Sequence, residues 1–227
     1  MCGIVAILTR PATRPVPAAA ELIEQLDAAS AAVDLPTATE HLRLVNGWLL
    51  GAPGVEALVE RPDVVAEIVA RLSRLDAVAQ AEEARVEALD AASADLERAN
   101  ADLIALRDVL WAIRNDRLRT ASAVGGLAGR GAGRAALRGF TAVQQALSAI
   151  DRMEVRGRDS AGLHLYVWDH GLDPADPAFA AALQQRSSDA LFTSGSVRFT
   201  DNVLSFVYKA AAEIGELATY LLIRPGR

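Results

Sequence analysis

The chain has 227 residues, of which 52% are hydrophobic and 23% are charged, and its formal net charge is −6. This composition supplies enough apolar side chains for a folded core and excludes a disordered chain. The acidic balance, with Lys209 as the only lysine, excludes a basic surface that follows nucleic-acid phosphates. The single cysteine excludes an internal disulfide and a cysteine-based zinc site.

Residues 2–9 (CGIVAILT) predict a short buried strand, because they are aliphatic and β-branched and end at Arg10 and Pro11. The apolar run from Cys2 to Leu8 is too short to span a membrane. It also lacks the basic leader and the cleavage site of a secretory signal. We therefore expect a cytoplasmic protein that does not associate with a membrane.

The segment from residue 18 to about residue 120 is predicted to be almost entirely helical, because its apolar residues recur at helical spacing. Between residues 63 and 124 there is no glycine or proline, and a coiled-coil seam is predicted. The phase of this seam slips near residues 80–85, where we expect a hairpin or kink. The partner of the seam is either the earlier helices or a second copy of the chain. The expected helices are 18–33, 37–50 and 55–60, and the seam comprises Val65, Ile68, Leu72, Leu75, Ala79, Leu89, Ala92, Leu96, Ala99, Leu103, Leu106, Leu110 and Ile113.

The remainder of the chain is predicted to mix helices and strands, because its apolar pattern changes from helical spacing to alternation. A glycine-rich stretch, residues 124–133, is expected to be a linker, although its glycines also hint at a dinucleotide loop. No strand precedes this stretch, so the linker is the favoured interpretation. The expected elements are a helix over 134–155, a turn over 156–160, a strand over 161–168, a helix over 174–186, and strands over 197–199 and 203–208 joined by a turn at Asp201 and Asn202.

Cys2 is the first candidate for chemistry. Removal of Met1 would leave the Cys2 thiol and a free α-amine, with a pKa of about 7.7–8.0, on the same residue. That residue would then hold both nucleophile and base, as in N-terminal-nucleophile hydrolases. The alternative is a buried cysteine at the start of a strand, without a catalytic role.

The second candidate is the run RGRDSAG over residues 156–162, between the predicted helix and strand. By itself it is consistent with a local turn, in which glycines supply unusual backbone angles and Asp159 bonds nearby. Together with MCGI at residues 1–4, however, it resembles the class II glutamine amidotransferases. Within that family it is most similar to the glutaminase part of glutamine–fructose-6-phosphate aminotransferases.

The resemblance implies an α/β (α+β) fold of the layered αββα, N-terminal-nucleophile hydrolase type, here incomplete. Residues 1–10 and 134–217 would form a partial glutaminase domain, residues 11–133 a helical insertion, and residues 218–227 an atypical tail. Cys2 would attack the side-chain amide of glutamine, form a thioester and release ammonia, which passes to fructose 6-phosphate to give glucosamine 6-phosphate. Arg156, Gly157, Asp159 and Ser160 would shape the glutamine pocket. The resemblance implies no cofactor and no metal, because ammonia itself is the amino donor.

The sequence also departs from the family pattern. Arg158 replaces the usual tyrosine, and neither a Thr-Arg-Trp motif nor the Asn-Gly pair of the oxyanion hole follows Gly162. We therefore expect a truncated form that is weakly active or inactive. Two alternatives remain: a non-catalytic helical interaction module on a remnant of the fold, or the glutaminase part of another class II amidotransferase. Self-association through residues 11–133 is expected if the seam pairs with a second copy.

Overall fold

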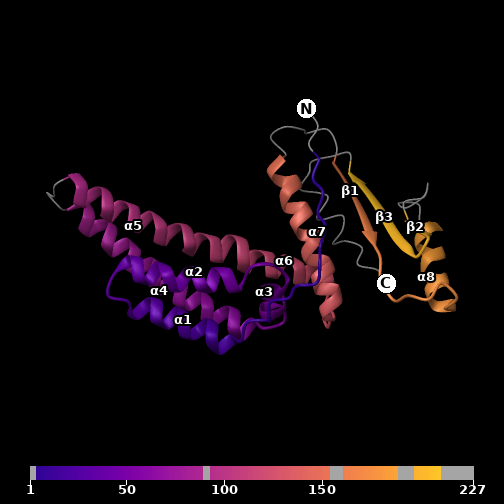
Figure 1. The fold of residues 1–227 in the computed structure, drawn as a ribbon, viewed down its shortest axis with the longest axis horizontal. Coiled ribbons are helices and arrows are strands. Elements are labelled where there is room, and N and C mark those ends of the chain that lie inside the picture. Colours follow the sequence, from indigo (N-terminus) through magenta and orange to yellow (C-terminus); the bar gives the residue numbers. More distant parts are fainter. Residues whose placement is uncertain (1–3, 89–92, 154–160, 189–196, 211–227) are drawn as a thin grey trace. The chain divides into compact units, whose positions relative to one another are not determined.

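The computed structural model describes residues 4–88, 93–153, 161–188 and 197–210 (Figure 1). Contacts divide the chain into two compact units, one of residues 8–144 and one that joins residues 1–7 to residues 145–227. The described residues are mostly helical and include one antiparallel sheet of three strands. The predicted mixture of helix and strand is therefore confirmed at this level. None of the helices in the described ranges is long and apolar enough to cross a bilayer.

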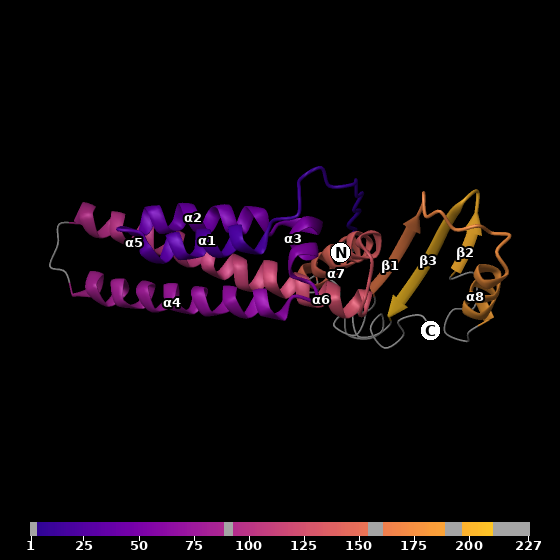
Figure 2. The same ribbon diagram turned by 90° about the horizontal axis from the view of Figure 1, so that it is seen from below.

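The helical unit, residues 8–144, is built on four helices that lie side by side (Figures 1 and 2). Contacts join α1 to α2, α2 to α5, α5 to α4, and α4 back to α1, so the four helices close a bundle. The short helix α3 and the helices η1 and α6, which continue directly from α5, complete the unit, and α7 begins in it. The elements are α1 (Ala19–Ala31), α2 (Leu35–Trp48), α3 (Gly51–Leu58), α4 (Pro62–Glu87), α5 (Ser93–Trp111), the π-helix η1 (Ala112–Leu118), α6 (Arg119–Ala128) and α7 (Arg134–Met153).

Side chains that lie outside α2 satisfy backbone groups at both of its ends. Asp34 precedes α2, and its Oδ1 accepts the backbone N–H of Thr37 at 2.8 Å, which satisfies one of the donors left open at a helix start. At the other end, the Arg14 guanidinium donates to the carbonyl oxygens of Gly47 and Leu50. Arg14 thereby ties the proline-rich segment before α1 to the C-terminal end of α2.

The predicted seam forms the core of the bundle. Most of its described members in α4, α5 and η1 pack with apolar residues of α1 and α2, so the partner of the seam is the earlier helices, whereas Leu96 and Ala99 near the start of α5 are only half-buried. At the start of α4 the buried residue is not the predicted seam residue Val65, which is only half-buried, but its neighbour Val64. Leu89 and Ala92 lie outside the described residues. The buried seam residues are Ile68, Leu72, Leu75, Ala79, Leu103, Leu106, Leu110 and Ile113, and the largest residues facing them are Leu22, Leu26, Leu42 and Val45.

The expected hairpin lies later in the chain than residues 80–85, because α4 continues to Glu87 and α5, which packs against α4, begins at Ser93. Glu82, which falls on the seam by spacing, pairs with Arg85 one turn later, and the Arg85 Nε to Glu82 Oε2 distance is 2.8 Å. Glu83 pairs with Arg107 of α5. A partner for each carboxylate lets the helix pass through this charged stretch without a turn.

The expected linker over residues 124–133 is wrong in its first half. Helix α6 continues to Ala128, because Val124 and Leu127 are buried and their packing offsets the low helix propensity of the glycines between them. The helix ends at Gly129, whose φ of 78° is one that glycine adopts readily. Only residues 129–133 connect α6 to α7.

The second unit contains the sheet and helix α8 (Pro177–Ser188). The strands are β1 (Ala161–Val167), β2 (Val197–Thr200) and β3 (Val203–Ala210), in the order β1-β3-β2. Asp201 and Asn202 have φ values of 52° and 60° and form the predicted two-residue hairpin turn between β2 and β3. Helix α8 lies beside β2, where the rings of Phe179 and Phe199 meet edge to face at 5.6 Å (Figure 2).

The predicted buried strand at the N-terminus is wrong for its described residues, 4–9, which are not in a strand. Ile4 is 93% exposed and Leu8 is 72% exposed. The described strands pair only with one another, and residues 4–9 join none of their ladders. An apolar, β-branched segment becomes a strand only when a neighbouring strand accepts its backbone hydrogen bonds, and composition does not supply that neighbour.

Ion pairs between the helices predict acid sensitivity of the helical unit. Hydrogen bonds from Arg71 of α4 lower the pKa of Asp27 on α1, and hydrogen bonds from Arg107 of α5 lower the pKa of Glu83 on α4. A carboxyl group whose pKa is lower when folded contributes stability above its unfolded pKa and loses it as the pH falls through the folded value. We therefore expect the urea midpoint to be constant near neutrality and to fall below about pH 4.

Asp27→Asn is the variant that checks this assignment. Its urea midpoint should fall less between pH 7 and pH 3 than that of the unchanged chain, because one of the titrating groups is gone. The difference should be small, since exposed ion pairs contribute little each. An acid loss of the same size in both proteins would show that Asp27 does not contribute.

Candidate functional site

All five candidate site residues lie outside the residues that the structure describes. They are Cys2, Arg156, Gly157, Asp159 and Ser160. Their roles in glutamine binding and hydrolysis therefore stay predictions. The structure does describe the helix and the strand that flank residues 154–160, and the chain that follows residue 3.

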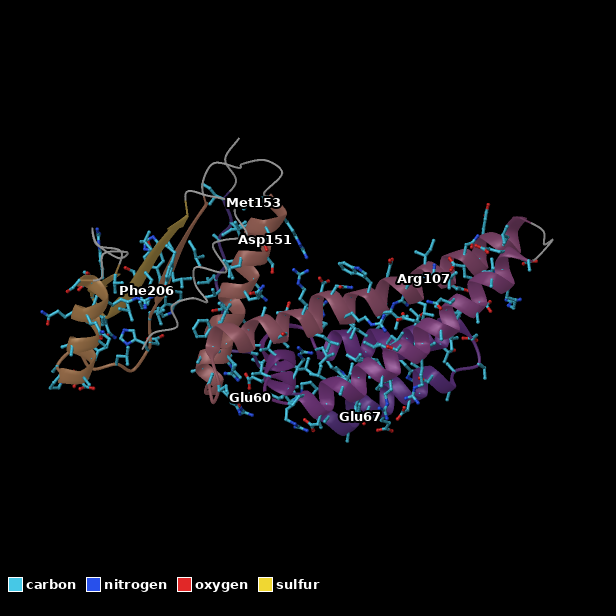
Figure 3. All side chains as sticks on the ribbon, turned by 180° about the vertical axis from the view of Figure 1, so that it is seen from behind. Glu60, Glu67, Arg107, Asp151, Met153 and Phe206 are labelled. Carbon is cyan, nitrogen blue, oxygen red and sulfur yellow. The ribbon has the colours of Figure 1, made fainter. Side chains whose placement is uncertain are left out.

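Helix α7 leads into the motif. Its predicted apolar face is confirmed, because Leu137, Val143 and Leu147 are buried. Thr141 lies on the same face and is also buried, and its hydroxyl donates to the carbonyl oxygen of Leu137 at 2.7 Å. The helix ends at Met153, which is labelled with Asp151 in Figure 3.

Strand β1 leaves the motif and is held along its length by β3. Ala161 pairs with Ala210 at one end of the ladder and Val167 pairs with Leu204 at the other. The predicted alternation holds in the first part of the strand, where Leu163 is buried whereas His164 and Tyr166 are exposed, but it fails at Val167, which is 39% exposed. A strand paired at every position is a rigid element of the unit.

The N-terminal residues belong to the same compact unit as the motif strand. The unit that contains β1 and the end of α7 also includes residues 1–7, whereas the helical unit begins at residue 8. The chain after the first candidate motif and the strand after the second thus share one unit, although the whole helical unit separates them in sequence. This shared unit is the one structural observation that bears on the two motifs together.

Two histidines in and just after β1, His164 and His170, have local hydrogen-bond partners. The His164 Nδ1 lies 3.0 Å from the Tyr166 hydroxyl oxygen, and the backbone N–H of Leu172 donates to the Nδ1 of His170 at 3.0 Å. The His170 ring also lies against Phe199, with ring centroids 5.6 Å apart. Within the described ranges, no three His, Cys, Asp or Glu side chains come together as metal ligands.

The sequence analysis missed Glu56 of α3, which anchors the start of α7. The Glu56 side chain is only 3% exposed, and its Oε1 accepts from the Nε of Arg138 at 2.8 Å. The Nε of Arg134 lies 3.2 Å from its Oε2. A buried carboxylate needs such cations, and removing them would leave an uncompensated charge. No local pattern reveals this cluster, because Glu56 and Arg138 are 82 residues apart in the sequence.

No protein-family model, no curated protein and no solved structure matches this chain. The likeness to class II glutamine amidotransferases therefore rests on residues 1–4 and 156–162 and on the elements that flank them.

Proposed function

We propose that the chain is a glutaminase of the class II amidotransferase type, with ammonia passed to fructose 6-phosphate as in the family that it resembles. The observation that supports this proposal is the shared compact unit, which joins the chain after Cys2 to strand β1 after residues 156–160. In this proposal the helical unit is an insertion between the two halves of the glutaminase part.

The proposed reaction begins after removal of Met1. The free α-amine of Cys2 accepts the thiol proton, and the sulfur bonds to the side-chain amide carbon of glutamine. The carbon–nitrogen bond then breaks, the leaving nitrogen takes the proton, and ammonia departs from a thioester. Water attacks the thioester, which releases glutamate and restores the thiol. Arg156, Gly157, Asp159 and Ser160 are proposed to shape the glutamine pocket.

Covalent labelling of Cys2 tests this proposal more directly than turnover does. A glutamine analogue that carries a diazoketone in place of the amide should add once to the chain, because Cys2 is its single cysteine. Excess glutamine should slow the labelling, whereas excess asparagine should not. Intact mass and N-terminal sequencing measure the adduct and the removal of Met1. Retained Met1, or labelling that glutamine does not slow, would contradict the proposal.

Cys2→Ala is the matched control and should take no adduct. Ammonia release by the unchanged chain should stay below about 1 s⁻¹, a rate that ordinary enzymes reach. The reason is that no Asn-Gly pair follows Gly162, and the loss of one oxyanion donor costs about 10²–10³ in rate.

A second candidate is a non-catalytic interaction module. It is favoured by one observation, that residues 4–9 are exposed and outside the sheet, which leaves the segment after the nucleophile without a rigid support. This candidate predicts that a general thiol reagent and the glutamine analogue label Cys2 alike, and that glutamine protects against neither. The labelling experiment therefore separates the two candidates.

A further inference from the structure

A groove of about 380 Å³ lies in the helical unit, where the corner between α3 and α4 meets α6. Its floor is apolar and consists of Leu58, Val59, Val65, Leu118 and Ala121. This volume is within the range of sites that hold small molecules. The groove is independent of the proposed glutaminase site, because all of its lining residues belong to residues 8–144.

Three locally unfavourable features meet at this groove. Glu60 has a φ of 60°, which costs a residue with a β-carbon free energy. Leu118 ends the π-helix η1, a rare form that is frequently found at functional sites. Gly125 lies inside α6, where alanine would be more favourable by about 1 kcal/mol. Such departures from local preference are expected where a site has a function.

Packing does not require a glycine at position 125. A β-carbon there would lie 3.6 Å from the nearest methyl carbon of Val59, which is an ordinary contact. The absence of a side chain on Gly125 therefore leaves the groove open rather than relieving a clash.

The rim of the groove carries two opposite charges that do not neutralise each other. No ion pair joins Glu60 to Arg130, although the structure describes both residues. The Glu60 Oε1 instead accepts the backbone N–H of Gly131, next to Arg130 in the chain. Arg61, the other cation on the rim, pairs with Asp63 at 3.1 Å. Figure 3 labels Glu60 at this end of the helical unit.

We propose that this groove binds a small aliphatic zwitterion, of which a branched-chain α-amino acid is the simplest example. The apolar floor takes the aliphatic side chain, the Glu60 carboxylate takes the ammonium group, and the Arg130 guanidinium takes the carboxylate. A ligand with a single charge would pair with only one of the two rim charges, and a ligand without charge would pair with neither.

Titration of the full chain with L-leucine, followed by NMR chemical shifts or calorimetry, tests the proposal. Two truncated probes separate the contacts: 4-methylpentanoate lacks the ammonium group, and 3-methylbutylamine lacks the carboxylate. Each should bind about tenfold more weakly than leucine, the difference that one charge-assisted hydrogen bond makes. No response to leucine in the tens of millimolar, or equal affinity for leucine and either probe, would overturn the proposal.

Substitutions identify the groove as the place of binding. Glu60→Gln keeps an oxygen that can accept the N–H of Gly131 and removes the charge, so leucine affinity should fall about tenfold. Arg130→Gln should have a similar effect. Arg119→Gln is the matched control, because this exposed arginine of α6 lies outside the groove. Equal affinity in the Arg130 and Arg119 variants would overturn the assignment.

Gly125→Leu gives a second, steric test, because the leucine side chain would enter the groove beside Val59. Leucine binding should be lost while the circular dichroism spectrum stays helical. Unchanged leucine binding in a folded Gly125→Leu protein would place the ligand elsewhere and overturn the proposal.

Discussion

Leu103→Glu is expected to unfold much of the helical unit. Leu103 lies on the buried face of α5 and is only 4% exposed. Loss of its apolar contacts costs about 2–5 kcal/mol, as for other large core residues. A carboxylate buried without a partner adds further destabilisation of several kcal/mol. The total approaches the whole stability of an ordinary domain, about 5–15 kcal/mol.

Thermal melts followed by far-ultraviolet circular dichroism measure this effect, and the neighbouring residue provides the control. Ile104 is 59% exposed, so Ile104→Glu should leave the melting temperature nearly unchanged. Leucine and isoleucine are isomers, so the two variants have the same mass and net charge, and they differ mainly in which face of α5 carries the added charge. Equal melting temperatures for the two variants would mean that α5 does not bury the predicted seam.

Gly54→Ala is expected to have the second-largest effect. A β-carbon at Gly54 would lie 2.0 Å from the carbonyl oxygen of Leu49 and 2.2 Å from its carbonyl carbon, so backbone must move to admit it. Overpacking against backbone costs about 1–3 kcal/mol, occasionally more. The effect should appear as a lower urea midpoint with an unchanged slope, since the folded core stays the same size.

Gly47→Ala is the control for Gly54→Ala. Gly47 lies inside α2, and a β-carbon there would meet no atom within 4 Å. Alanine should therefore stabilise the helix by about 1 kcal/mol, so that the same substitution has opposite signs at the two glycines. A loss of stability at both positions, or at neither, would contradict the described turn between α2 and α3.

Some features of the candidate site and its surroundings could be predicted from a short stretch of sequence, and others could not. The pattern of residues 156–162 suggested a turn before a strand, and β1 begins where that pattern placed it. Glu56 could not be found in this way, because its burial depends on Arg134 and Arg138, which are distant in sequence. Glu60 and Arg130 line the same groove only because α3 and α6 pack together in the folded chain.

The sequence by itself determined the elements whose stabilising contacts repeat along a short stretch. The spacing of leucines such as Leu72 and Leu106 predicted the buried seam, because helical periodicity places such residues on one face. Asp201 and Asn202 predicted the β2–β3 hairpin, because both residue types tolerate the left-handed backbone that a two-residue turn requires.

Only the tertiary structure decided the features that depend on distant partners. Residues 4–9 have the composition of a strand, yet no described strand pairs with them, and a ladder needs two strands. A break was expected at residues 80–85, but α4 continues to Glu87, and Glu83 in this stretch pairs with Arg107 of α5. Val124 and Leu127 extend α6 through glycines because other helices bury them. In each case the free energy that settled the conformation comes from groups that meet only when the chain has folded.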